Sequence, residues 1–90
     1  ENPLKGISVR ITSPEMLAQA LKNIRKERQL SQSVVADNVG LKQATLSGFE
    51  NKPEASRVET LFKLLTALDL ELHLSERDAK NAEAGWDQEW

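Results

Sequence analysis

The spacing of apolar residues predicts that most of this chain is helical. Apolar positions recur every three or four residues along several stretches, as a helix with one buried face requires. These stretches are 14–28, 32–39, 41–51 and 56–68. Ser13 and Ser31 are residue types that cap helix starts, and Pro14 suits a first helical position. Gly40 supplies the left-handed residue that often ends a helix.

The expected core takes one apolar face from each of the four helices. The fourth helix is predicted to begin at Ser56, because Ser56 and Glu59 have the spacing of a capping box, in which two side chains bond the first free N–H groups. The predicted core residues are Leu17, Ala20, Leu21, Ile24, Val35, Leu41, Leu46, Phe49, Val58, Leu61, Phe62, Leu65 and Leu68.

After the fourth helix the apolar period becomes alternating, which predicts a β-strand over 70–75. Its apolar face holds Leu70, Leu72 and Leu74. The N-terminal arm, 1–12, alternates in the same way at Ile7, Val9 and Ile11. A lone strand cannot satisfy its backbone hydrogen bonds. We therefore expect the strand to pair across the two-fold axis of a homodimer, with the arm as a possible further strand.

Composition narrows the classes of function. With 90 residues the chain is one small domain, and with no Cys and one His it offers no disulfide, no cysteine zinc site and no multi-histidine metal site. The sequence shows no combination of a nucleophile with a general base and no glycine-rich phosphate-binding loop. We therefore expect the protein not to be an enzyme and to bind no cofactor or metal. The absence of a long apolar span or secretory signal predicts a cytoplasmic protein with no membrane partner.

Charge is distributed unevenly along the chain. The net charge of −2 combines +1 over residues 1–74 with −3 over residues 75–90. The acidic tail, 76–90, has no sustained periodicity, so we expect it to be flexible. It nevertheless contains Trp86 and Trp90. Since an indole gains little in water, partner docking is a better interpretation of these two residues than solvent exposure.

The stretch "LKQATLSGFEN", from Leu41 to Asn51, has an unusual polar face. Small or amide side chains stand where a surface helix usually carries Lys and Glu. The outward positions are Lys42, Gln43, Ala44, Ser47 and Gly48. Such a face suits close approach to base edges in the DNA major groove, and it lacks acids that would repel phosphate. A protein-binding role for the same helix is the alternative.

The segment "LKNIRKERQLSQSVVADNVGLKQATLSGFEN" resembles the Xre/Cro-type helix-turn-helix family. The resemblance implies a mainly α, lambda-repressor-like domain of four to five helices, assigned here to 13–69. It also implies that Gln32 braces Gln43 and contacts phosphate, and that Arg25 pairs with Glu50 as part of the scaffold. This chain departs from the family at Lys42, where Ser or Thr is more common at the cap position.

Beyond this motif, the stretch "KQATLSGFENKPEASRVETLFKLLTALDLELHL", followed by "DAKNA" and a terminal "EW", resembles HipB-type antitoxins, and the resemblance covers about residues 13–90. That resemblance implies a homodimer that represses transcription at palindromic operators and neutralises a HipA-type Ser/Thr kinase toxin, nucleoid-associated when bound to DNA. It places base contacts at Lys42, Gln43, Ala44 and Ser47, and DNA backbone contacts at Gln32, Thr45 and Lys52. Trp86 and Trp90 become a toxin-docking element or a handle for a cytoplasmic protease. A stand-alone Xre regulator with an interaction tail is the alternative function.

Overall fold

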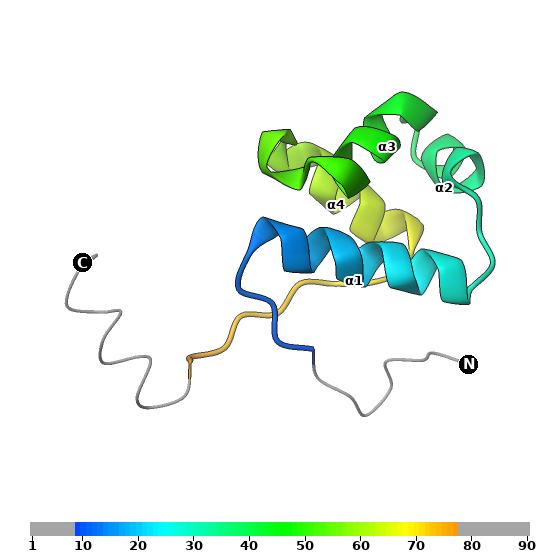
Figure 1. Cartoon of the computed structure of the whole chain (residues 1–90). Coiled ribbons are helices and arrows are strands. Elements are labelled where there is room, and N and C mark those ends of the chain that lie inside the picture. Colours follow the sequence, from blue (N-terminus) through cyan, green and yellow to red (C-terminus); the bar gives the residue numbers. More distant parts are fainter. Residues whose placement is uncertain (1–8, 78–90) are drawn as a thin grey trace.

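The computed structural model describes residues 9–77, and this part of the chain is helical with no strand (Figure 1). Its elements are α1 (Pro14–Glu27), α2 (Gln32–Asn38), α3 (Gln43–Asn51), the short 3-10 helix η1 (Pro53–Ala55) and α4 (Val58–Ala67). The prediction of a mainly α, four-helix domain is confirmed. Ile7, Trp86, Trp90 and most of the tail lie outside the described residues, and what the sequence implies for them stays a prediction.

Two serines start the first two helices as the sequence predicts. Ser13 Oγ accepts a hydrogen bond from the N–H of Met16 at 3.1 Å, and Ser31 Oγ accepts one from the N–H of Val34 at 3.1 Å. Each bond satisfies one of the N–H groups that a helix start leaves free. Lys42, at the start of α3, provides no such side-chain bond. The first turn of α3 is therefore closed by backbone hydrogen bonds to Lys42 O, without the side-chain bond that α1 and α2 have.

Three helices end in the same hydrogen-bonded motif. At the end of α2, Gly40 has φ +70°, its N–H bonds to Asp37 O at 3.3 Å, and the N–H of Leu41 bonds to Ala36 O at 2.9 Å. This is a Schellman motif, which requires a left-handed residue just beyond the helix. The helices α1 and α4 end in the same way at Gln29 (φ 58°) and Asp69 (φ 57°), where no glycine marks the turn.

The predicted start of α4 is wrong. Ser56 belongs to the 3-10 turn that Pro53 begins, and its N–H bonds to Pro53 O at 3.0 Å. The helix starts beyond it, with Arg57 at the cap position and no side-chain cap bond. Glu59 instead lies 3.7 Å from Lys63 Nζ, one helical turn later. The capping box does not form because Ser56 ends the 3-10 helix and does not occupy the cap position of α4.

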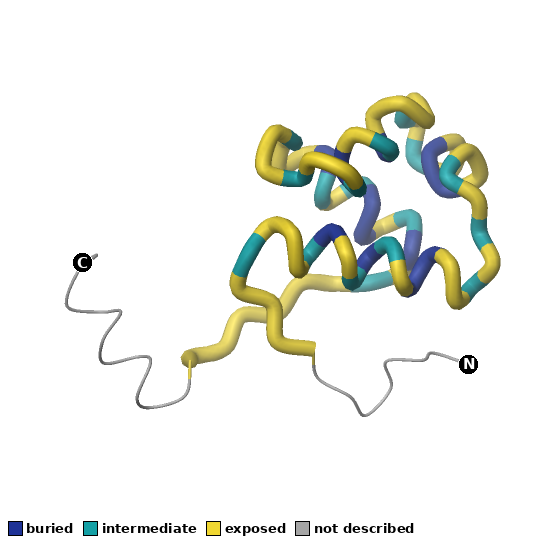
Figure 2. Tube along the Cα trace, in the orientation of Figure 1, coloured by how far each residue is buried: buried dark blue, intermediate teal, exposed yellow. Residues whose placement is uncertain are grey.

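The core lies between the four α-helices (Figure 2). Its most enclosed large side chains are those of Val35 and Leu64. Two predicted core residues of α4, Val58 and Phe62, are 68% and 49% exposed, whereas Leu64, which the prediction omitted, is buried. The helix packs against α2 and α3, and the stripe centred on Leu64 fills that contact. Val58 and Phe62 are one turn apart and lie outside it.

The segments that flank the helices leave the helical body below α1 in Figure 1, whereas α3 lies at the top. Leu70 follows the turn that ends α4 and packs against the core of its own chain. Leu72 and Leu74 are 49% and 94% exposed. Residues 70–77 have no strand partner within the described part of this single chain, so the intermolecular sheet remains a prediction. Among the helices described, none has the length and apolar character needed to cross a bilayer.

Candidate DNA-binding surface

The helices α2 and α3 form a tight helix-turn-helix unit. Ala36 is fully buried where the two helices cross. Its side chain is a single methyl group, which lets the helices approach closely. Its carbonyl oxygen accepts the N–H of Leu41, which fixes the turn between them. Leu46 and Phe49 then anchor α3 to the core. The turn and these two anchors together set which face of α3 is exposed.

The exposed face of α3 carries the residues that the sequence singles out for DNA. Lys42, Gln43, Ala44, Thr45 and Gly48 are exposed. Ser47 is half-buried, and its Oγ accepts a hydrogen bond from Asn51 Nδ2 at 3.3 Å. Lys52, at the end of the helix, is also exposed.

The space beside Gly48 is open, because a Cβ atom at this position would have no other atom of the described structure within 4 Å. No acidic side chain interrupts the exposed positions of α3. This face therefore offers cations, amides, hydroxyls and small side chains to an incoming polyanion.

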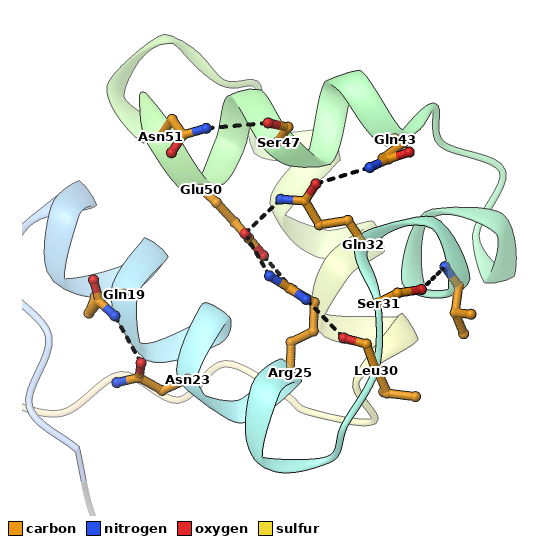
Figure 3. A network of polar contacts seen from close by, with 11 residues as sticks. Gln19, Asn23, Arg25, Leu30, Ser31, Gln32, Gln43, Ser47, Glu50 and Asn51 are labelled. Carbon is orange, nitrogen blue, oxygen red and sulfur yellow. Dashed lines mark hydrogen bonds and ion pairs between the residues drawn. The ribbon is translucent and has the colours of Figure 1, made fainter.

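An ion pair joins α1 to the far end of α3 (Figure 3). Arg25 Nε lies 2.7 Å from Glu50 Oε2, and Arg25 Nη2 lies 3.0 Å from Glu50 Oε1. The guanidinium also donates from Nη1 to the carbonyl oxygen of Leu30 at 2.8 Å. The two charged side chains are only 10% and 3% exposed, so solvent screens this pair weakly. The structure thus brings together the two residues assigned to the scaffold.

Gln32 connects this ion pair to the exposed face of α3. Its Nε2 donates to Glu50 Oε1 at 2.9 Å, and its Oε1 accepts from Gln43 Nε2 at 3.3 Å (Figure 3). The contact between Gln32 and Gln43 is the brace that the family resemblance implies. The bond from Gln32 to Glu50 was not anticipated. It links two contacts that the sequence analysis treats separately into one continuous network from Arg25 to Gln43.

The network keeps Glu50 ionised. Burial alone raises the pKa of this carboxyl group, but hydrogen bonds from Arg25 and Gln32, together with the positive charges of Arg25 and Lys22, lower it below its usual value of 4.5. Stabilisation of the anion thus exceeds the cost of its desolvation.

The basic residues of α1 divide into two groups. Arg25 is buried in the ion pair, and Arg28 donates from Nη1 to the carbonyl oxygen of Leu68, which ties the end of α1 to the end of α4. Lys26 is exposed and Lys22 is half-buried. Arg25 and Arg28 therefore hold the scaffold together, and Lys26 is the exposed cation of this cluster.

Comparison with known proteins supports the interpretation of this surface. The profile of the family described as "Helix-turn-helix" matches residues 21–74. The antitoxin HipB of Escherichia coli strain K12 is 45% identical over 73 residues, which cover 81% of each chain. The chain belongs to the HipB-like helix-turn-helix family. Two similar solved structures are described as "HipB-O4 20mer complex" and "Structure of HipA-HipB-O2-O3 complex".

Each of these two HipB structures has a TM-score of 0.77 and 39% sequence identity to this chain, and covers 79% of this chain and all of its own. At this identity the likeness covers both the fold and the family. The helix-turn-helix unit of this chain is therefore similar in fold and sequence to that of HipB.

The first prediction concerns the stability that the ion pair provides. Replacing Glu50 with Leu leaves the guanidinium of Arg25 buried without its carboxylate, which should lower the free energy of unfolding by roughly 3–5 kcal/mol. The double variant Arg25→Leu, Glu50→Leu buries no charge and should recover a large part of that loss. Urea denaturation at neutral pH gives the free energy of unfolding of the parent protein, the single variant and the double variant. Equal stability of the single variant and the parent protein would contradict the structural role of the pair.

The same pair predicts a dependence on pH. Because the folded-state pKa of Glu50 lies below its unfolded value, its contribution is fully present above about 4.5 and is lost as pH falls through the lowered pKa. The Glu50→Leu variant should lack this part of the acid destabilisation when both proteins are unfolded in urea across the acidic range.

Proposed function

We propose that this chain is a transcriptional repressor and antitoxin that binds palindromic operator DNA as a homodimer and neutralises a HipA-type Ser/Thr kinase. The observation that carries the proposal is the exposed face of α3, which is free of acids and whose leading amide is held in place by the network from Arg25. Membership of the HipB-like family supports both halves of the proposal. The protein acts in the cytoplasm and associates with the nucleoid through its operator.

The base contacts are assigned to Lys42, Gln43, Ala44 and Ser47. A glutamine amide matches adenine, which offers an acceptor and a donor side by side in the major groove, and a lysine suits the two acceptors of guanine. The methyl group of Ala44 suits the methyl group of thymine. The hydroxyl of Ser47 accepts from Asn51 and keeps its own hydrogen to donate.

The backbone contacts are assigned to Gln32, Thr45 and Lys52. Gln32 uses one amide hydrogen on Glu50, so its second hydrogen is available for a phosphate oxygen. Thr45 and Lys52 are exposed at the two ends of α3. Contacts of this kind hold the protein in register but carry no sequence information, and each charged one adds to the salt dependence of binding.

The dimer interface is assigned to the segment after α4. Leu72 and Leu74 are exposed apolar residues, whereas Leu70 already packs in its own chain. Val58 and Phe62 add exposed apolar surface on α4. Pairing two copies would cover these side chains and satisfy the backbone groups of 70–75. A two-fold dimer presents two recognition helices about 34 Å apart, or a multiple of that distance, to a palindromic site.

The toxin contact is assigned in part to Trp86 and Trp90, which lie outside the described residues. An indole provides a large apolar anchor with one polar group, as a docking segment needs. The charge of −3 over residues 75–90 disfavours a position beside phosphate. The same segment would serve as a protease handle in the free protein and be shielded in the complex.

A prediction for the DNA surface separates base reading from positioning. Gln43→Ala and Lys42→Ala should each cost roughly 1–3 kcal/mol and relax selectivity at one base pair per half-site. Lys52→Ala should weaken all sites similarly and reduce the slope of binding against salt by about 1. Lys63→Ala, which removes a lysine of α4 that pairs with Glu59, is the charge-matched control.

Affinities for single-base variants of the operator, first selected from random duplexes with the parent protein, measure these effects. An unchanged selectivity profile for both Gln43→Ala and Lys42→Ala would show that another face of α3 meets the bases. Failure of the parent protein to select any sequence would refute the DNA-binding proposal itself.

Another prediction concerns assembly. Replacing Leu72 and Leu74 with Asp should convert the dimer to a monomer, because carboxylates cannot be buried in a two-stranded apolar interface. Operator affinity should fall with it, since each monomer holds only one half-site. Sedimentation velocity at micromolar concentration measures the mass, and Met16→Asp, an exposed apolar residue of α1, is the control. A parent protein that is monomeric and still binds its operator tightly would contradict the model.

A further prediction concerns the tail. Deleting residues 85–90 should leave dimerisation and operator affinity nearly unchanged while weakening the toxin complex or lengthening the life of the free antitoxin. The variant Trp86→Ala, Trp90→Ala should reproduce the effect if the indoles provide it. Calorimetric titration with toxin and a degradation time course are the measurements. Loss of operator binding with unchanged toxin affinity would instead assign the tail to the DNA-binding function.

A further inference from the structure

We propose that Glu50 is a positioning residue that sets the direction of the base-reading amide of Gln43, acting through Gln32. Glu50 is at the opposite end of α3 from Gln43 and is itself almost fully enclosed. The inference rests on the proposed DNA-binding function and adds to it a residue that touches no base. Three links in the network carry it, and each follows from which atoms can donate and which can only accept.

The first link fixes the carboxylate. Arg25 donates to both oxygens of Glu50, from Nε at 2.7 Å and from Nη2 at 3.0 Å, while its Nη1 is held by Leu30 O. Two parallel bonds define the plane of the carboxylate as well as its position. Since Glu50 is 3% exposed, water does not compete for these oxygens. The carboxylate is therefore a fixed group that only accepts hydrogen bonds.

The second link orients the amide of Gln32. An amide has a donating end and an accepting end, and only the donating end can face a carboxylate. Gln32 Nε2 accordingly lies 2.9 Å from Glu50 Oε1. The carbonyl oxygen of Gln32 is then turned away from Glu50 and toward Gln43, at the start of α3. Reversing this amide would place its carbonyl oxygen against the carboxylate oxygen of Glu50, two acceptors with no hydrogen between them.

The third link transfers that direction to Gln43. Because Gln32 presents its oxygen, Gln43 must present its NH₂ group, and Gln43 Nε2 lies 3.3 Å from Gln32 Oε1. One hydrogen of that NH₂ group and the carbonyl oxygen of Gln43 remain available. They form a donor and an acceptor in one fixed order, as bidentate contact with a single base requires. The order is set by the charge on Glu50, not by Gln43 itself.

Neutralising Glu50 removes the direction while keeping the shape. In Glu50→Gln the new amide still accepts from Arg25, but its own NH₂ group can donate to Gln32. Gln32 is then free to take either orientation, and Gln43 with it. A residue that only stabilised the fold would lower affinity for every site to the same extent. A positioning residue changes the preference at the one base pair that Gln43 reads.

The test measures base preference at the position whose selectivity Gln43→Ala abolishes. A bidentate amide contact gives a preference of about 5- to 150-fold there, and Glu50→Gln should reduce it severalfold with little change at other positions. The double variant Glu50→Gln, Gln32→Glu restores an acceptor-only group beside Gln43 and keeps the net charge, so the preference should return. Glu15→Gln, an exposed acid at the start of α1, is the charge-matched control.

Three outcomes would overturn the proposal. Glu50→Gln could retain the preference while weakening all sites equally, or the double variant could fail to restore it. Glu50→Gln could prove too unstable to assay, and Gln32→Leu then interrupts the same network while it leaves the ion pair of Arg25 intact. A base preference that is preserved in Gln32→Leu is the third outcome that would overturn the proposal. A parent protein with no sequence preference would refute the proposed function instead, so the two failures are distinguishable.

Discussion

The ion pair between Arg25 and Glu50 is the interaction on which the rest of this structure depends. Burying two charges is costly, and the cost is offset only when every donor and acceptor finds a partner. The end of α1 supplies one of those partners, because the turn at Gln29 brings Leu30 back against Arg25. The carbonyl oxygen of Arg25 accepts the N–H of Leu30, and the guanidinium bonds the carbonyl oxygen of Leu30 in return. Helix ending and ion pair thus stabilise each other.

Much of the fold could be predicted from the sequence because its determinants are local. Ser13, Ser31 and Gly40 mark helix ends by their own chemistry, and the structure confirms each of them. The helix ends at Gln29 and Asp69 carry no such mark. Both residues adopt a left-handed conformation, which costs most side chains about 1 kcal/mol or more, so their residue types do not predict it. Packing of the leucines that follow them offsets that cost, and packing cannot be inferred from the composition of the turn alone.

The errors in α4 and the missing link in the network have a related cause. Ser56 has the chemistry of a cap, but the 3-10 turn begun at Pro53 takes it up before α4 starts. The bond between Gln32 and Glu50 joins residues 18 positions apart on different helices. Family resemblance supplied the pairs at its two ends, but only the geometry of α2 against α3 shows that they share one carboxylate. Interactions set by helix packing are those that sequence patterns miss.

The two exposed surfaces of the domain are separate, and this separation bears on how one small chain can serve two partners. The helix α3 lies at the top of the view in Figure 1, whereas the chain beyond α4, which carries the exposed Leu72 and Leu74, leaves below α1. In the sequence, residues 75–90 carry a net charge of −3. Contacts made there need not displace DNA from α3. A domain built this way offers DNA and a protein partner two different surfaces.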